Sequence, residues 1–575
     1  MTPLPRKDES QEDEALAGGT AGAPSPQPAP AAAEGAIGAP PAGADRPQAL
    51  VMSRGRALAY IGAAVLLGLA QGLGMNAIAA NINQIQGSFG VTATEATWLM
   101  AAYMAPNASL SLILIKVRNQ FGLRRFAEIG IVLFALVSAV HLYVDDFRTA
   151  LVLRFFAGMA ASPMSSLAFL YMLEPFAPAR KMTLGLCLSL ANIAIATPVA
   201  RLISPPLLDL GQWHAVYTVE MGFALLALIA VYRLPLSPQP RTHVITLADI
   251  VSYLFLAVGF GALSVVLIVG RLYWWMEAPW LGVLLATGLL SLSVSVIIEL
   301  NREAPLIDVR WLTSAPILHF AAVLLTFRIL LSEQSAGAIP FLTQLGVAPA
   351  QIAVLWATML VSSVVAGLAC AFVLKPGREP LIHLVALVMI GTGALLDSFS
   401  TSLTRPEQMI ASQMLIAAGG ALFLPPALSS GMMMALKNGP NYILSFIVVF
   451  LTTQNIGGLI GSALLGTFVT VREKFHSSQL VEHLTLTDPL VAQRIGQLGG
   501  AYGKTIGDRG LLQAEGAQLL SQQASREAYV LAYNDLFRLI AILCAVALAG
   551  LLLDLALRRL RTRPSVSNDP IVQKP

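Results

Sequence analysis

Long apolar segments recur from about residue 57 to about residue 557, and they constrain the fold more than any other feature. A bilayer core of about 30 Å needs about 20 apolar residues in a helix that rises about 1.5 Å per residue. Helices also satisfy their own backbone hydrogen bonds, as a segment surrounded by lipid must. We therefore predict an all-α polytopic membrane protein. We place fourteen membrane-spanning helices at residues 57–80, 95–115, 126–144, 149–173, 183–208, 214–233, 249–269, 280–299, 316–340, 351–374, 381–400, 408–435, 442–470 and 535–557.

Composition excludes a water-soluble globular protein. The chain is 56% hydrophobic and 12% charged, whereas a soluble domain carries about 25% charged residues. Its three cysteines, Cys187, Cys370 and Cys544, lie in apolar segments without disulfide or zinc-ligand spacing. The sequence also has no nucleotide-binding loop and no paired catalytic motif. We predict no cofactor, no metal, no catalytic residue and no nucleic-acid partner, and hence no enzyme.

Two polar tails flank the apolar region. Residues 1–56 begin with a mixed-charge patch and continue as an Ala/Pro/Gly tract, a composition that has too little to bury to become ordered. The first apolar run starts near Ala57, too late for a signal peptide. We predict a disordered cytoplasmic tail at 1–56 and a second cytoplasmic tail at 558–575.

Basic residues are distributed unevenly over the short loops, and this asymmetry predicts orientation. Successive loops lie on alternate sides of the membrane. The loops on one side, together with the four arginines after the last helix, hold most of the arginines and lysines, whereas the short loops on the other side hold only Arg148, Arg271 and Arg405. Because positive loops stay inside, we expect both termini in the cytoplasm. The excess of arginine over lysine is typical of a GC-rich bacterium, so we expect a multi-pass protein of a bacterial inner membrane.

Residues 471–534 form one long polar loop. Leu511, Leu512, Leu519 and Leu520 give it helical apolar spacing. Long loops cross a membrane largely regardless of charge. We therefore predict a small extracytoplasmic helical cap.

Arg154 lies within an otherwise apolar predicted helix, 149–173. An arginine near mid-bilayer costs roughly 2.5–3.5 kcal/mol on insertion scales unless it faces a cavity or a partner. Gly158 and Ser162 follow at four-residue steps, which allows a neighbouring backbone to approach closely. We expect Arg154 to face a translocation pathway. The alternative is a structural arginine that binds carbonyls of adjacent helices.

The spacing of Arg154 and Gly158 resembles the fourth-helix motif of the major facilitator superfamily. Residues 85–90, 212–217 and 526–537 are similar to segments of its fourteen-helix drug/proton antiporter branch, the EmrB/QacA-like proteins. The resemblance implies two six-helix bundles, 57–233 and 316–557, with two inserted helices at 249–299. The C-terminal bundle would include the 471–534 loop.

The cytoplasmic loop after the second predicted helix matches the superfamily signature only in part. Gly122, Arg124 and Arg125 resemble the end of this gate motif, but Lys116 stands at its first glycine and Asn119 at its acidic position. Without that carboxylate, the contact between its charge and a helix dipole that would lock two helices on the inner side is missing. We therefore expect other contacts to hold the inner gate.

Two other motifs are degenerate. Branch members usually have an aspartate in the first helix, where this chain has Gly74. The fifth-helix antiporter motif, normally a glycine-proline followed by a glycine pair, is reduced to a segment around Pro198 that ends at Arg201. Proton exchange therefore cannot be carried over from these motifs.

A proton-coupled transporter still needs a group that titrates within the membrane. The candidates are Glu333 with Arg328 in the ninth predicted helix, Asp397, Glu220 and Arg154. Burial disfavours a charged carboxylate and makes reversible protonation possible. Glu333 is the first choice, because we expect Asp397 and Glu220 to lie nearer the membrane interface. The alternative is a static salt bridge from Glu333 to Arg328 or Arg154.

Amide side chains supply candidates for the substrate pathway. These are Asn76, Asn192, Gln454 and Asn455. Amides can bind a substrate, but they also bridge helices for about 0.6 kcal/mol each. Both interpretations remain open.

Together these features predict a secondary transporter that exports hydrophobic or amphipathic small molecules against proton entry. The alternatives are a non-transporting scaffold that retains the fold, and an exporter of one endogenous metabolite. Protons, the lipid bilayer and a small-molecule substrate are the expected partners. Gram-negative members of the branch pass substrate to a periplasmic adaptor and an outer-membrane channel, which makes the 471–534 cap a candidate docking element.

Overall fold

A computed structural model describes residues 52–177, 180–236, 245–302, 305–375, 377–439 and 442–561, and within them the chain consists of helices and short connections. Of the predicted tails 1–56 and 558–575, residues 1–51 and 562–575 lie outside the described residues, whereas residues 54–56 and 558–561 are helical. The helices are α1 (Arg54–Ala80), α2 (Ile82–Phe89), α3 (Ala93–Phe121), α4 (Leu123–His141), α5 (Phe147–Leu173), α7 (Leu186–Arg233), α8 (Leu247–Val269), α9 (Pro279–Leu300), α10 (Val309–Leu312), α11 (Ala315–Leu331), α12 (Ile339–Gln344), α13 (Pro349–Val373), α14 (Glu379–Asp397), α15 (Ile410–Asn438), α16 (Tyr442–Glu482), α17 (Pro489–Gly500) and α18 (Arg509–Arg561). Two π-helical turns, η1 (Lys181–Gly185) and η2 (Gln334–Ala338), and a 3-10 turn, η3 (Pro406–Met409), complete the elements.

Local sequence signals explain where several helices begin. Thr92 caps α3, and its hydroxyl and the Glu95 carboxylate form a capping box that satisfies otherwise free N–H groups. Thr246 and Asp249 form the same arrangement at the start of α8. Gly122 separates α3 from α4 with a φ of 87°, a backbone conformation that glycine adopts without a steric penalty.

Twelve helical segments of the described ranges are long and apolar enough to cross a membrane. The predicted second and third spans are present as α3 and α4, which fall outside that criterion, so the count of fourteen stays a prediction. The fifth and sixth predicted spans are two parts of one continuous helix, α7, in which Pro198, Pro205 and Pro206 all lie inside the helix. Two separate segments of this stretch, Lys181–Leu207 and Trp213–Arg233, are each long and apolar enough to cross a membrane, and Pro205 and Pro206 lie at the end of the first segment.

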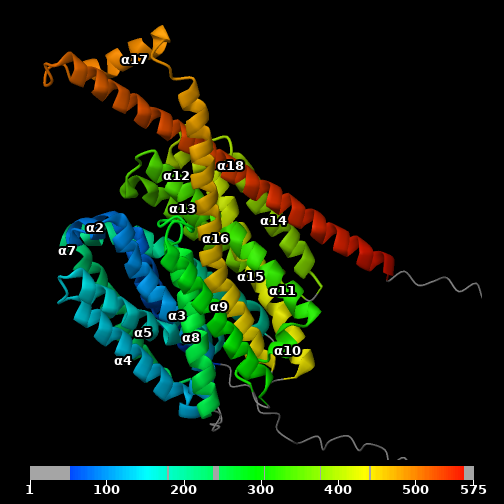
Figure 1. The fold of residues 1–575 in the computed structure, drawn as a ribbon. Helices are drawn as coiled ribbons and strands as arrows, with labels where there is room; N and C mark the ends of the chain where they lie inside the picture. Colours follow the sequence, from blue (N-terminus) through cyan, green and yellow to red (C-terminus); the bar gives the residue numbers. More distant parts are fainter. Residues whose placement is uncertain are drawn as a thin grey trace, which may run out of the picture. The chain divides into compact units, whose positions relative to one another are not determined.

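The helices pack as two groups around separate apolar cores (Figure 1). In the first group, α1 packs on α5 and α7, and α4 packs on α5 and α7. In the second group, α14 packs on α15 and α18, and α11 packs on α16. The pair α8 and α9 pack on each other and α8 lies along α3. This arrangement is that of two bundles with an inserted helix pair.

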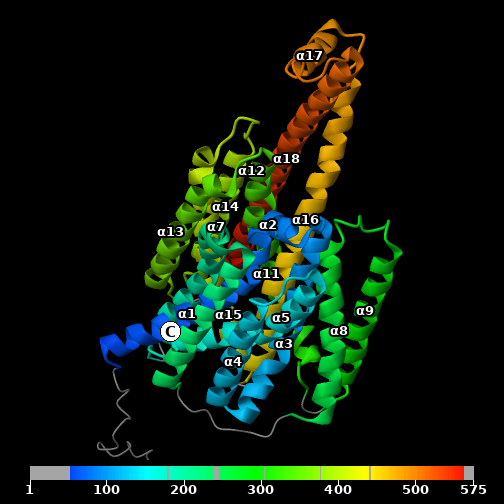
Figure 2. The same cartoon turned by 90° about the vertical axis from the view of Figure 1, so that its left-hand side faces the viewer.

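The predicted cap is helical, and the flanking helices extend into it. Figure 2 shows α16 and α18 continuing side by side beyond the bundle to α17. The α17 and α18 backbones approach closely, because a Cβ at Gly499 would lie 2.2 Å from the Leu512 carbonyl oxygen. The loop of residues 471–534 is therefore mostly helix rather than irregular chain.

Candidate functional site

A buried polar cluster surrounds Arg154 on α5. The side chain is 1% exposed, and its Nη2 donates a hydrogen bond of 2.7 Å to the Gly74 carbonyl oxygen on α1. Its guanidinium lies over the ring of Tyr103 on α3, 4.3 Å from the ring centroid. A close approach of α3 and α5 makes this possible, since a Cβ at Gly158 would lie 2.1 Å from the Tyr103 carbonyl oxygen. Arg154 thus faces the inside of the bundle, where it binds a carbonyl.

Glu220 on α7 places a carboxylate in the same cluster. It is fully buried, and Oε1 accepts a hydrogen bond of 3.0 Å from Ser138 on α4. Arg154 acts on this carboxylate electrostatically, although none of its nitrogens lies within 4.0 Å of it in the described coordinates of both residues. The cluster therefore holds opposite charges without a direct ion pair.

Gly74 shows how the cluster differs from the first-helix aspartate expected in the antiporter branch. A Cβ at position 74 would lie 3.2 Å from Glu220 Oε1 and 3.2 Å from the Tyr103 hydroxyl. The Glu220 carboxylate therefore lies beside the position that a side chain at residue 74 would occupy. A carboxylate from a different helix reaches the region in which the branch has its aspartate.

Several polar atoms of the cluster are buried without a hydrogen-bond partner among the described residues. They are Arg154 Nε and Nη1, Glu220 Oε2, the Tyr103 hydroxyl and His141 Nε2. An unsatisfied buried polar group costs about 1–3 kcal/mol. Such groups call for an explanation such as a functional role or an unseen bound species.

A second buried cluster joins Glu333 to Asp397. Gln413 on α15 donates from Nε2 to both Glu333 oxygens, at 3.1 and 3.3 Å, and to Asp397 Oδ2 at 2.7 Å. The Ser412 hydroxyl also donates to Asp397. Glu333 and Gln413 are fully buried and Asp397 is 3% exposed. One amide thus binds both carboxylates, and Asp397 is the last residue of α14; that Asp397 lies nearer the membrane interface than Glu333 stays a prediction.

Neither expected arginine neutralises these carboxylates. In the coordinates of these residues, no nitrogen of Arg328 or Arg154 lies within 4.0 Å of Glu333, so the static salt bridge is absent. Arg328 instead donates from Nε to the Gln454 carbonyl oxygen on α16 at 3.1 Å, next to Gly457 and Gly458. Two buried carboxylates with no cation in contact strongly disfavour double ionisation. The cluster is therefore chemically suited to hold a proton.

The other amide candidates have helix-bridging contacts. Asn192 on α7 donates to the Ala64 carbonyl oxygen on α1 at 3.0 Å. Asn76 on α1 accepts a hydrogen bond of 3.2 Å from Thr197 on α7. Pro198 follows Thr197 within the same helix. The Gln454 Nε2 is buried without a partner among the described residues, and Asn455 lies beside it on α16 and is half-buried.

The inner-gate motif carries an unexpected charge cluster. Lys116 on α3 donates to Asp249 Oδ1 on α8 at 2.7 Å, and Arg302 lies 2.8 Å from the same oxygen. Of the motif's own arginines, the exposed Arg124 pairs with the half-buried Glu128 at 2.8 Å, and Arg125 is exposed. The latch residue missing from the motif is thus replaced by a carboxylate on the inserted helix pair.

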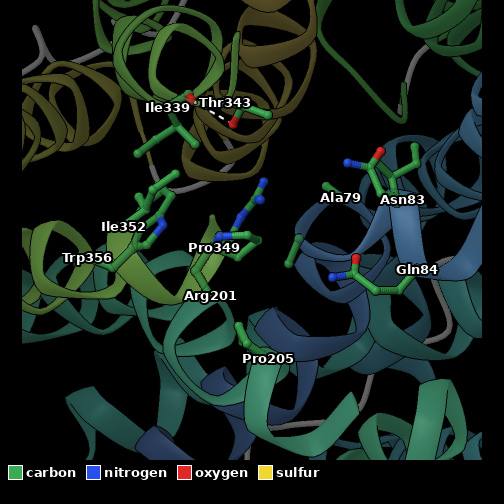
Figure 3. A pocket seen from close by; sticks show the side chains of 12 residues that line it. Ala79, Asn83, Gln84, Arg201, Pro205, Ile339, Thr343, Pro349, Ile352 and Trp356 are labelled. Carbon is green, nitrogen blue, oxygen red and sulfur yellow. Dashed lines mark hydrogen bonds between the residues drawn. The ribbon is translucent and has the colours of Figure 1, made fainter. Parts of the chain in front are cut away.

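A cavity of about 130 Å³ lies between the two helix groups (Figure 3). Its lining comes from α1, α2 and α7 of the first group and from α12 and α13 of the second. The same helices α7 and α13 touch farther along, where a Cβ at Gly367 would lie 2.9 Å from the Ala191 Cβ. The two groups are therefore packed together near Ala191 of α7 and separated by a cavity near Arg201 and Pro205 of the same helix.

Residues 64–462 match the family model described as Major Facilitator Superfamily. The chain belongs to this superfamily. It is therefore a multi-pass membrane transporter and not an enzyme, with the fold that the two helix groups indicate.

Named relatives of this facilitator include exporters. It is 23% identical to the fatty acid resistance protein FarB of Neisseria gonorrhoeae over 477 residues, which cover 79% of this chain and 87% of FarB. It is 22% identical to the multidrug export protein EmrB of Haemophilus influenzae over 498 residues, covering 84% and 93%. Among solved structures, the human organic anion transporter MFSD10 matches with a TM-score of 0.51 at 12% identity, covering 85% of this chain and 99% of that chain. This last likeness supports the fold alone.

Sequence reasoning did not identify several residues that complete these sites. Gln413, Ser138, Tyr103 and Asp249 were not singled out, because amides, hydroxyls and helix-start acids are common in any membrane protein. A search for polar residues at four-residue steps from known charges would not have paired them, since each contact joins different helices. The facilitator fold is what brings them together.

Proposed function

We propose that this facilitator exports hydrophobic or amphipathic small molecules in exchange for protons. The observation that carries the proposal is the buried cluster in which Gln413 binds both Glu333 and Asp397. The printed names of FarB and EmrB, resistance to fatty acids and multidrug export, support the direction and the substrate type. A scaffold without transport activity would have no need for such a cluster.

The cluster can couple a proton to a change of conformation. Doubly ionised, Glu333 and Asp397 repel each other in a site with little water, so binding of a proton is favoured while the site is closed. Access to water or to a cation from one side then allows the proton to leave. A transporter that opens alternately to its two sides can use this difference to let protons in as substrate goes out.

The Arg154 cluster is the second proposed coupling element. Glu220 is the only charged acceptor near the Arg154 guanidinium among the described residues, and its Oε2 is unpartnered. Protonation of Glu220 would leave Arg154 without a counter-charge and would favour its movement toward another anion. We propose that the two sites act in the same cycle, with Glu333 as the primary proton carrier.

We further propose an inner-membrane location with both termini in the cytoplasm, based on the distribution of arginine and lysine in short loops. The helices α16 to α18 would then extend on the opposite side. This placement suits docking of a periplasmic adaptor that leads to an outer-membrane channel.

The test of the proposed function replaces the carboxylates one at a time. In proteoliposomes with an imposed proton gradient, Glu333→Gln and Asp397→Asn should abolish uphill transport of a compound to which expression confers resistance. Exchange of the same compound without a gradient should persist, because the amide oxygen of the variant still accepts one hydrogen bond from Gln413. Glu407→Gln, an exposed acid in η3, is the matched control and should transport normally.

The outcomes separate the candidate functions. Normal uphill transport by both cluster variants would contradict proton coupling through this site. Absence of any flux by the unaltered protein across a broad panel would favour the scaffold. Saturable flux of a single compound would favour an exporter of one metabolite.

A further inference from the structure

The cavity between the helix groups contains one charged side chain. Its other lining side chains are apolar, amide or hydroxyl groups, and none of them is acidic. The lining residues are Ala79, Ala80, Ile82, Asn83, Gln84, Arg201, Pro205, Ile339, Thr343, Pro349, Ile352 and Trp356. At about 130 Å³ the cavity has room for several water molecules or a small headgroup.

Arg201 extends from α7 into this cavity. Figure 3 shows its guanidinium between the α13 side, with Ile352 and Trp356, and the α2 side, with Asn83. Its Nε is buried without a hydrogen-bond partner, and no ion pair involves Arg201 among the described residues. The guanidinium lies over the Trp356 ring, 5.6 Å from the centroid, which fixes its direction but leaves its donors free.

Among the described residues, no anionic group pairs with the Arg201 guanidinium in this cavity. An arginine stays protonated in proteins, and a partly desolvated guanidinium without a counter-charge is unfavourable. Its planar donors match a carboxylate in a bidentate geometry. The buried side chains of Ile352 and Trp356 beside it offer an apolar surface to the rest of a ligand.

We propose that Arg201 recognises the carboxylate of an amphipathic anionic substrate, whose apolar body lies against Ile352 and Trp356. The inference rests on the proposed export function and narrows its substrate class to organic monoanions with an apolar chain. Asn83 and Gln84 on the opposite wall supply amide groups that can orient the same headgroup. Neutral analogues lose the charge interaction, and cationic analogues are repelled.

The test measures binding at the cavity itself, without a proton gradient. Bromine quenches nearby tryptophan fluorescence, so 6-bromohexanoate and 6-bromohexanol report on Trp356 in nanodisc-embedded full-length protein. Trp356→Phe removes that signal and identifies the part of the quenching that comes from the cavity. Arg201→Gln removes the charge and keeps a polar N–H group on a shorter side chain, and Arg201→Lys keeps the charge.

We expect 6-bromohexanoate to bind the unaltered protein more tightly than 6-bromohexanol. In Arg201→Gln the carboxylate should bind about 10- to 100-fold more weakly, which corresponds to one hydrogen-bonded charge. The alcohol should bind within about twofold of its original affinity, which also shows that the variant is folded. Arg201→Lys should retain part of the preference.

Equal binding of the carboxylate by Arg201→Gln and the unaltered protein would overturn the inference, as would quenching by the carboxylate that is just as large in Trp356→Phe as in the unaltered protein. Equal weakening of carboxylate and alcohol would assign Arg201 a structural role and also overturn it. Glu407→Gln, the exposed control variant, should bind the carboxylate normally. If the unaltered protein transports with the proton gradient but does not prefer the carboxylate to the alcohol, this inference is wrong and the proposed function stands. If it prefers the carboxylate but does not couple transport to protons, the proposed function is wrong and the binding site stands.

Discussion

The charge cluster of Lys116, Asp249 and Arg302 should hold the inserted helix pair to the first bundle. Asp249 is fully buried, and the side chains of Lys116 and Arg302 are 5% and 14% exposed. At the 2.7 Å between Lys116 Nζ and Asp249 Oδ1, Coulomb's law with an effective dielectric constant of about 20 gives about 6 kcal/mol. Desolvation of both charges offsets part of this. We expect a net coupling of about 2–4 kcal/mol, within the range measured for close charge pairs.

A double-mutant cycle measures this coupling directly. Lys116→Met, Asp249→Asn and the double variant are unfolded reversibly in mixed detergent micelles, and the free energies of unfolding are compared. Asp249→Asn alone should be the most destabilising, because it leaves Lys116 and Arg302 buried together without a carboxylate. Hydrogen exchange should increase in α8 in the same variant.

The matched control is the more exposed Arg124 and Glu128 pair on α4, whose side chains are 68% and 24% exposed and whose distance is a similar 2.8 Å. Exposed pairs at this helical spacing contribute about 0.3–0.5 kcal/mol. A coupling for Lys116 and Asp249 no larger than that of the control would refute the reasoning, because burial would then have added nothing to the pair.

Two further predictions concern Arg154 and the cap. Arg154→Ala should abolish export while the protein is present in the membrane at normal levels. Arg154→Lys should also be inactive, because a lysine cannot keep both the hydrogen bond to Gly74 and the position over the Tyr103 ring. Unchanged export would contradict a role of Arg154 in the pathway. Replacing residues 477–525 with a short Gly/Ser linker removes α17 but keeps His476, whose ring lies 2.7 Å from Asp535. Flux in proteoliposomes should persist while resistance in cells is lost, and retention of both would remove the proposed adaptor.

Hydropathy predicted most of the fold because lipid imposes a simple rule on helix length. Each apolar run had to become a helix, and the second and third runs also did so as α3 and α4. The sequence could not decide whether Pro205 and Pro206 end a helix, since prolines are tolerated inside membrane helices when neighbouring helices satisfy the freed carbonyls. In this protein α7 continues through both.

The sites were less predictable because hydropathy contains little information about helix rotation. Glu333 and Arg154 were identifiable, since a charge in an apolar run is conspicuous in the sequence. The partnership of Glu333 with Asp397 was not, because it depends on Gln413, an amide 80 residues from Glu333 and 16 residues from Asp397. Neighbouring positions on a helix are rotated by about 100° about its axis, so an error of one residue in the predicted position would turn a side chain toward a different neighbouring helix.

The position of Glu333 relative to the cavity suggests how a proton could affect substrate binding. Glu333 directly precedes the π-helical turn η2, which leads into α12, and two α12 residues, Ile339 and Thr343, line the cavity. A Cβ at Gly337 within this turn would lie 3.1 Å from Glu333 Oε1, so the turn packs against the carboxylate. π-helical turns inside α-helices are frequent at functional sites, where they relieve or store a local mismatch. A change in the charge of Glu333 therefore acts at the base of the helix that forms one cavity wall, while Arg201 faces that cavity from the other bundle.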